Sequence, residues 1–241
     1  AVVRAVEAEG GEVRRAVAAP FPDQAVRDGR LERLRLADGS ELAADRFVFA
    51  CGPWLGALFP EAVGRRIRPT RQEVFFFGPP AGDARFAETG CPVWVDFGER
   101  IFYGVPGNEH RGFKVADDTH GEEVDPTTLE RRPTSEALER ARALLRERFP
   151  AMAGAPLLEA RVCQYENTAD GHYLIDRHPE AGNVWLVGGG SGHGFKLGPA
   201  LGERVAGWVL GDEEPPAQFA LERLDEIEGP ERSQLETGEG P

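Results

Sequence analysis

Residues 182–203 read GNVWLVGGGSGHGFKLGPALGE, and CQYENTADGHYLID stands shortly before them at 163–176. The apolar run at 183–187 predicts a buried strand. A glycine-rich loop is expected at 188–198 and a helix at 199–210, because the proline suits the first turn of a helix. The sequence here therefore predicts a strand, a loop and the positive end of a helix at one place in the core.

Three known motifs do not fit this loop. No frame supplies G-x-G-x-x-G, a Walker loop requires glycine where Phe195 stands, and a nucleophile elbow around Ser191 requires glycine where His193 stands. The loop does offer backbone that a ligand can approach closely. It suits either cofactor contact or a structural turn, and both interpretations stay open. The glycines concerned are Gly188, Gly189, Gly190, Gly192 and Gly194.

Residues 1–66 predict the first part of the same core. The expected elements are a helix end at 1–9, a strand at 12–17, a hairpin of 24–26 with 31–36, a strand at 45–52 and a helix at 54–59.

Further along, several β-rich stretches between residues 68 and 114 predict an antiparallel sheet in a second domain. They read EVFFFG, CPVWVDF, RIFYGVPG and RGFKVA, with Gly, Pro and Asp between them. Residues 134–149 predict an amphipathic helix capped by Thr134. Residues 157–165 predict another strand, and 215–224 a short closing segment. Residues 231–241 are polar enough to be disordered.

Composition excludes several classes of function. The net charge is −13, and residues 212–241, with ten acidic side chains against two arginines, supply eight of these charges. No basic face for nucleic acid is apparent, and no run approaches the roughly 18 apolar residues of a membrane span. The five histidines lack metal-ligand spacing. Three widely spaced cysteines indicate a reducing compartment, so we expect a cytoplasmic protein.

The two lysines stand out, because the other 26 of the 28 basic residues are arginines. An ammonium is a compact point charge, whereas a guanidinium is planar and bulky. Lys114 and Lys196 therefore indicate sites where arginine would not serve, although two ordinary surface lysines explain the count equally well.

The order of these pieces resembles the D-amino-acid oxidase superfamily of FAD-dependent oxidoreductases, in particular its monomeric sarcosine oxidase branch, over residues 1 to about 224. The matching stretches are GGEVRRAV, LAADRFVFACGPWLGAL, RIRPTRQEVFFF and the two quoted first; Cys163, Tyr165, Thr168, Asp170 and Asp176 fall in register. The resemblance implies an α/β fold with an incomplete FAD/NAD(P)-binding domain, at 1–66 and 156–224, plus an antiparallel β-sheet substrate domain (α+β) at 67–155. Residues 225–241 would form an acidic, disordered tail.

The resemblance also implies roles for individual residues. Lys114 would sit over the flavin and activate dioxygen, and Lys196 would pair with a substrate carboxylate. Cys163 would join the flavin through a thioether, whereas composition alone allows a buried free cysteine. Glu166 stands where the branch has threonine, and Asp118 where it often has histidine. The implied FAD contacts are Gly52, Trp54, Cys163, Gly188, Gly189, Gly190, Ser191, Gly192, His193, Gly194, Phe195 and Lys196.

The reaction that the resemblance implies is oxidation of the C–N bond of an amine or an N-methyl or secondary amino acid to an imine, with dioxygen reduced to hydrogen peroxide. The sequence contains neither the family's G-x-G-x-x-G nor its acidic ribose ligand. We therefore expect a fragment that lacks the pyrophosphate site. Two rivals stay open: a non-catalytic subunit or pseudo-enzyme that pairs with a separate nucleotide-binding chain, and a flavin dehydrogenase with another electron acceptor.

Overall fold

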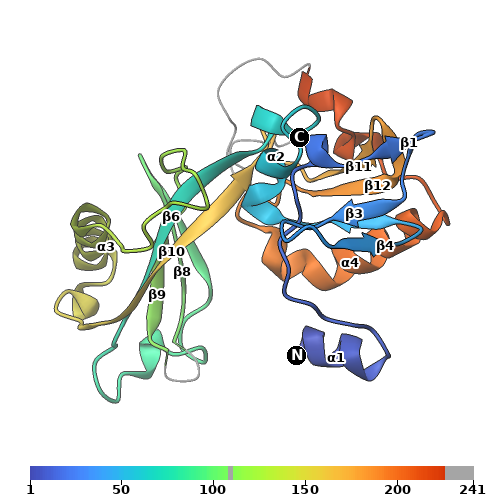
Figure 1. Ribbon diagram of the computed structural model, residues 1–241. Helices are drawn as coiled ribbons and strands as arrows, with labels where there is room; N and C mark the ends of the chain where they lie inside the picture. The colour runs from blue at the N-terminus through green and yellow to red at the C-terminus, as the bar shows by residue number, and fades with distance from the viewer. Residues whose placement is uncertain (108–110, 226–241) are drawn as a thin grey trace.

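The computed structural model describes residues 1–107 and 111–225. Two units are joined by two long strands, β6 (Arg68–Phe77) and β10 (Leu157–Asn167), which run from one unit to the other (Figure 1). One unit contains a five-stranded sheet, and the other a three-stranded sheet with two short hairpins. The predicted disordered tail lies, apart from Asp225, outside the described residues.

The five-stranded sheet is antiparallel and has the order β10-β6-β9-β8-β7, which confirms the predicted sheet. The helix α3 (Ser135–Arg148) packs on one face, and the Thr134 hydroxyl caps it by accepting the Ala137 amide at 3.2 Å, as expected. The remaining strands are β7 (Trp94–Phe97), β8 (Ile101–Val105) and β9 (Phe113–Asp117).

Alternation along β6 gives this sheet two different faces. Phe75 and Phe77 pack in the cluster under α3, whereas Val74 and Phe76 belong to a second cluster with Ala116 of β9. Successive side chains on a strand point to opposite faces, so Lys114 of β9, two residues before Ala116, lies on this second face. The face opposite α3 is therefore available for the functional site.

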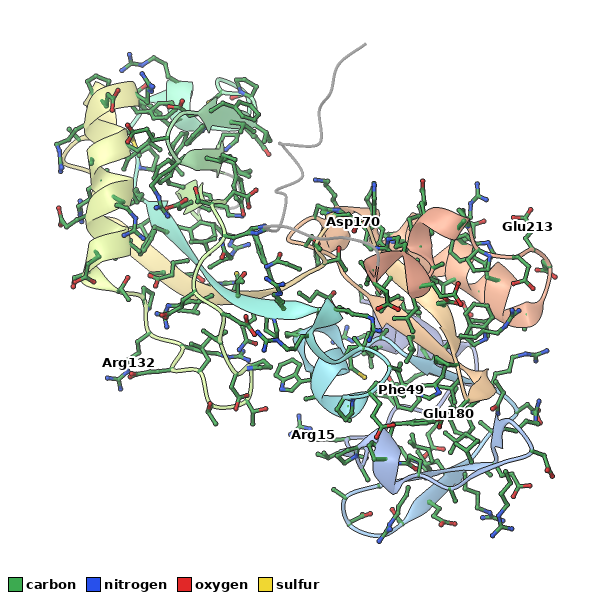
Figure 2. The ribbon with its side chains drawn as sticks, turned by 90° about the horizontal axis from the view of Figure 1, so that it is seen from above. Arg15, Phe49, Arg132, Asp170, Glu180 and Glu213 are labelled. Atoms are coloured by element: carbon green, nitrogen blue, oxygen red, sulfur yellow. The ribbon has the colours of Figure 1, made fainter. Side chains whose placement is uncertain are left out.

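The second unit is centred on β12 (Ala181–Gly188), which pairs antiparallel with β11 (Leu174–His178) and parallel with β5 (Phe47–Phe49). Apolar side chains bury both of its faces, one against α4 (Gly194–Leu210) and the other against α2 (Leu55–Leu58). Figure 2 shows Phe49, Asp170 and Glu213 in this unit and Arg132 on the side of the five-stranded sheet. The smaller elements are α1 (Val2–Ala8), β1 (Val26–Arg27), β2 (Arg30–Leu31), β3 (Arg33–Arg35) and β4 (Glu41–Ala43).

One predicted element is wrong, and another begins earlier than predicted. Residues 12–17 form no strand, because every one of them is exposed and no face of the segment is buried. The helix predicted from residue 199 begins at Gly194, so Gly194–Gly198 are helical and Pro199 lies inside α4. The missing amide of Pro199 removes only one bond, near an end where several amides lack helical acceptors, so the extra turn is tolerated.

The structure also assigns β10 to the five-stranded sheet, although a domain boundary at 155/156 would give it to the other unit. Its partner is β6 along the whole strand, from Leu157 opposite Phe77 to Asn167 opposite Arg68. The described helices include none that is both long and apolar enough to cross a membrane.

We predict that Gly104→Ala destabilises the five-stranded sheet by about 1–3 kcal/mol, because overpacking of a filled core has that cost. A Cβ at Gly104 would lie 2.1 Å from the Trp94 ring, which is held by stacking on Phe113. Urea denaturation measures the loss. Gly182→Ala is the control, since its Cβ meets nothing within 4 Å; equal stability of the two variants would contradict the prediction.

Candidate active site

A cavity of about 480 Å³ brings the two lysines of the chain together. One wall comes from β7 to β9 of the five-stranded sheet and the segment after β9, and the other from the glycine-rich loop and the first turn of α4. Apolar side chains line part of it and charged ones the rest. The lining residues are Val93, Val95, Ile101, Tyr103, Val105, Lys114, Asp118, His120, Ser191, Gly192, His193, Phe195 and Lys196.

Lys114 projects from the sheet face opposite α3. Its neighbours Phe113 and Val115 are completely buried on the other face, so alternation directs Lys114 toward the cavity. Its Nζ donates to the Tyr103 hydroxyl at 3.0 Å and lies 4.5 Å from the centre of the Tyr103 ring. The sheet and the aromatic ring thus hold this ammonium in a defined place.

Lys196 reaches the same cavity from the opposite side. It lies in the first turn of α4 and is exposed. The first amides of a helix have no acceptor within it and carry partial positive charge, so this wall of the cavity is electropositive.

Packing against the end of β10, the residue after it and α2 explains three of the loop glycines. A Cβ at Gly192 would lie 2.3 Å from the Tyr165 ring, and one at Gly189 would lie 2.7 Å from Thr168. At Gly188 it would lie 2.9 Å from Leu55. Gly189 and Gly192 also have φ of +71° and +83°, which side chains rarely adopt. The glycines are therefore required for structure, in addition to any contact with a ligand.

The loop amides that the sequence suggested for a cofactor face Glu166. The amides of Gly189 and Gly190 hydrogen-bond to its carboxylate, and that of Ser191 donates to its backbone oxygen at 3.2 Å. Glu166 Oε2 is buried without a hydrogen-bond partner. Burial raises the pKa of this carboxyl, and the two amides oppose that shift only in part.

Glu166 also influences two neighbouring side chains. Burial and the nearby Glu166 carboxylate raise the pKa of the Cys51 thiol, and they do the same to the Tyr173 phenol. Those two residues come from different elements, so Glu166 lies where β10, the loop and the segment after β5 meet.

His193 is held at the start of α4 by both ring nitrogens. Nδ1 lies 3.3 Å from the Tyr173 hydroxyl and Nε2 lies 3.1 Å from the Gly171 carbonyl oxygen. Since a carbonyl only accepts, Nε2 carries the proton and Nδ1 accepts from Tyr173. Burial lowers the pKa of His193, which favours this neutral form.

The structure places Cys163, Gly52 and Trp54 outside the cavity lining. Cys163 is a half-buried free thiol on β10, packed against the cluster of Val74, Phe76 and Ala116. Trp54 donates its indole N–H to Thr127 at 3.0 Å.

Of the residues in register with the family pattern, two contact cavity side chains: the Thr168 amide donates to the Ser191 hydroxyl at 3.3 Å, and the Tyr165 hydroxyl donates to Asp118 at 2.9 Å. Asp170 pairs with Arg223 at 2.8 Å, Asp176 accepts the Leu221 amide at 2.8 Å, and Thr168 donates to the His172 carbonyl at 2.7 Å. These three therefore have structural partners.

Sequence reasoning missed Tyr103. It stands in a strand between apolar residues, where a tyrosine is ordinary, and its role follows only from the pairing of β8 with β9, which sets Tyr103 opposite Ala116. Because Lys114 lies two residues from Ala116, both side chains share one face.

A model of the FAD dependent oxidoreductase family, also named DAO, matches residues 1–208 of the chain. The chain belongs to this family. It is 34% identical over 187 residues to the monomeric sarcosine oxidase of Bacillus sp. (strain B-0618), covering 74% of this chain and 46% of that protein. It is 30% identical over 175 residues to N-methyl-L-tryptophan oxidase of Salmonella heidelberg (strain SL476), covering 70% and 44%. The chain thus spans about half the length of these relatives.

Among solved structures, a thermally stable mutant of fructosyl peptide oxidase aligns with a TM-score of 0.77 at 20% identity, covering 98% of this chain and 59% of that one. This likeness shows the fold of FAD-dependent oxidases and supports the α/β plus antiparallel-sheet architecture predicted from sequence.

We predict that Glu166→Gln stabilises the protein at neutral pH by about 1–3 kcal/mol, since an unsatisfied buried charge has that cost. The folded-state pKa of Glu166 is raised, so the wild type loses stability as pH rises from about 4 through the folded-state pKa. The advantage of the variant should therefore vanish below about pH 4. Urea denaturation across pH measures it, with the exposed Glu139→Gln as control; a pH-independent difference would contradict the assignment.

Proposed function

We propose that this chain is the substrate-binding half of an FAD-dependent oxidase that converts the C–N bond of an N-methyl or other secondary amino acid to an imine and passes the electrons to dioxygen. The observation that carries the proposal is the convergence of Lys114 and Lys196 on one cavity, although they stand 82 positions apart in the sequence. The family membership and the names of the two relatives support the same class of reaction.

The residues present fit a flavin. The first-turn amides of α4 and the ammonium of Lys114 offer positive charge from two sides of the cavity, which suits a ring that becomes anionic on reduction. FAD, when bound, accepts a hydride from the carbon next to the amine nitrogen. The three loop amides already bind Glu166. We therefore assign cofactor contact, which the sequence suggested for these amides, to the first turn of α4 instead.

We assign substrate binding to the charged groups around the cavity. Lys196 pairs with the carboxylate of an amino acid, and Asp118 supplies the only carboxylate among the lining residues. The apolar wall of Val93, Val95 and Ile101 excludes water from the reacting carbon and accepts an N-alkyl group. Lys114 stabilises negative charge on oxygen as dioxygen is reduced.

Cys163 remains our candidate for a thioether to the flavin. It lies two residues before Tyr165 on β10, so both side chains share the face that leads to the cavity. Gly52 and Trp54 remain candidate FAD contacts. Gly52 has φ of +56° and open space where a Cβ would stand, which suits a close approach by a ligand.

Denaturing electrophoresis of the FAD-loaded protein tests the covalent link. Flavin fluorescence should comigrate with the wild type and with Cys91→Ser but not with Cys163→Ser. Fluorescence that persists in Cys163→Ser would disprove the assignment.

Replacement of each lysine separates the two proposed roles. Lys114→Met should slow reoxidation of the reduced protein by dioxygen by about 100-fold, the usual loss when one stabilising group is removed. Lys196→Met should instead raise the KM for an amino acid and leave reoxidation unchanged. Stopped-flow absorbance measures both, and wild-type reoxidation by dioxygen in Lys114→Met would favour a dehydrogenase.

A further inference from the structure

Four side chains connect the two ends of the cavity wall. Lys114 Nζ donates to the Tyr103 hydroxyl at 3.0 Å, and the Tyr165 hydroxyl donates to Asp118 Oδ1 at 2.9 Å. The Tyr103 hydroxyl lies close enough to Tyr165 to contribute to its raised pKa, which connects the two pairs. The result is a continuous series from Lys114 through Tyr103 and Tyr165 to Asp118.

The direction of every bond in this series is determined. An ammonium has no lone pair and only donates, whereas a carboxylate only accepts. Tyr165 gives its single proton to Asp118, so the proton between the phenols belongs to Tyr103. All of the donors therefore point from Lys114 toward Asp118 in this resting state. Once Asp118 is protonated and Lys114 has given up a proton, both phenol O–H groups turn round, and the series can carry a proton from Asp118 to Lys114.

The two phenols can pass a proton without ionising. Burial first, and then the neighbouring Tyr103 and Asp118, raise the pKa of Tyr165 far above its ordinary value. Tyr165 therefore stays neutral throughout the working pH range, and it can only exchange one proton for another.

Both ends of the series face the cavity, together with Lys196, His120 and His193. Lys114 and Asp118 carry opposite charges, so the series holds one acid and one base at separate points of the same wall. A carboxylate has about four acceptor sites, and Tyr165 uses one, which leaves capacity for an incoming ammonium group.

We propose that Lys114, Tyr103, Tyr165 and Asp118 form a proton relay in which Asp118 takes the proton that a bound substrate ammonium must lose, and Lys114 delivers one to reduced oxygen. This inference rests on the proposed function.

The atoms and electrons of the reaction balance through this relay. A secondary ammonium R–NH₂⁺–CH₃ that loses a proton and a hydride becomes R–NH⁺=CH₂. Dioxygen that gains the two electrons and the proton of that hydride, and then one further proton, becomes hydrogen peroxide. The further proton equals the one that Asp118 removed. Lys114 gives it up, and three proton shifts, from Asp118 to Tyr165, to Tyr103 and to Lys114, restore the starting state.

Nuclear magnetic resonance tests the connection without turnover. The chain has three tyrosines, so carbon-13 at the tyrosine Cζ gives three resonances, each assigned by replacement with phenylalanine. Asp118→Asn should displace the resonances of both Tyr165 and Tyr103, and Lys114→Met should displace the same two from the other end. Tyr173, whose hydroxyl contacts His193, is the internal control for Lys114→Met and should stay in place in that variant. Displacement of Tyr165 alone by Asp118→Asn would overturn the relay.

Anaerobic reduction of the FAD-loaded protein by sarcosine, used as the probe, tests the proton acceptor. At about pH 7, Asp118→Asn should slow reduction by about 100-fold, the usual share of general base catalysis. The rate in this variant should then rise about tenfold per pH unit, as solvent takes over deprotonation of an amine whose pKa is near 10. Tyr103→Phe should slow reoxidation, which depends on the relay, by a larger factor than it slows reduction.

Two results distinguish failure of the relay from failure of the proposed function. Wild-type reduction kinetics in Asp118→Asn at about pH 7 would overturn the role of Asp118 while leaving the oxidase intact. A wild-type protein that no N-methyl amino acid reduces would contradict the proposed function, and the tyrosine resonances would still decide whether the four side chains are coupled.

Discussion

The pairing of β10 with β6 is the constraint on which the rest of this structure depends. The two strands stay in one register over nine consecutive residue pairs, from Glu159 opposite Phe76 to Asn167 opposite Arg68, and continue from the five-stranded sheet to the other unit. At its far end, β10 brings Tyr165 to Asp118 of the cavity lining and Glu166 to the glycine-rich loop. Because consecutive side chains on a strand point to opposite faces, these two neighbours can serve the two units at once.

Local signals in the sequence sufficed for much of the fold. Thr134 caps its helix, the stretches around 73–116 form the expected strands, and the loop follows its buried strand. The start of α4 could not be predicted, because proline is also tolerated one turn further in, where its missing amide removes a single hydrogen bond. The predicted strand at 12–17 failed because alternation forms a strand only when one face has something to pack against.

The candidate site was predictable in its two lysines and in the loop residues Ser191, Gly192, His193 and Phe195, which line the same cavity. The scarcity of lysine among arginines marked Lys114 and Lys196, and the fold brings both to one cavity. Tyr103 and the contact of Tyr165 with Asp118 depend on register between strands that are distant in sequence, which composition cannot give. The sequence showed that Glu166 departs from the family pattern. It did not show that the Glu166 carboxylate accepts hydrogen bonds from the amides of Gly189 and Gly190. The loop is therefore partly neutralised from within, and the first turn of α4 carries the remaining positive charge.

The most direct test of this account is a double-mutant cycle between Gly192 and Tyr165. Gly192→Ala should cost about 2–4 kcal/mol, from overpacking against Tyr165 and from positive φ. In a Tyr165→Ala background only the backbone cost of about 1 kcal/mol should remain, giving a coupling of 1 kcal/mol or more, roughly. Urea denaturation of the four proteins measures it. Additive losses would contradict the claim that the end of β10 and the glycine-rich loop hold each other in place.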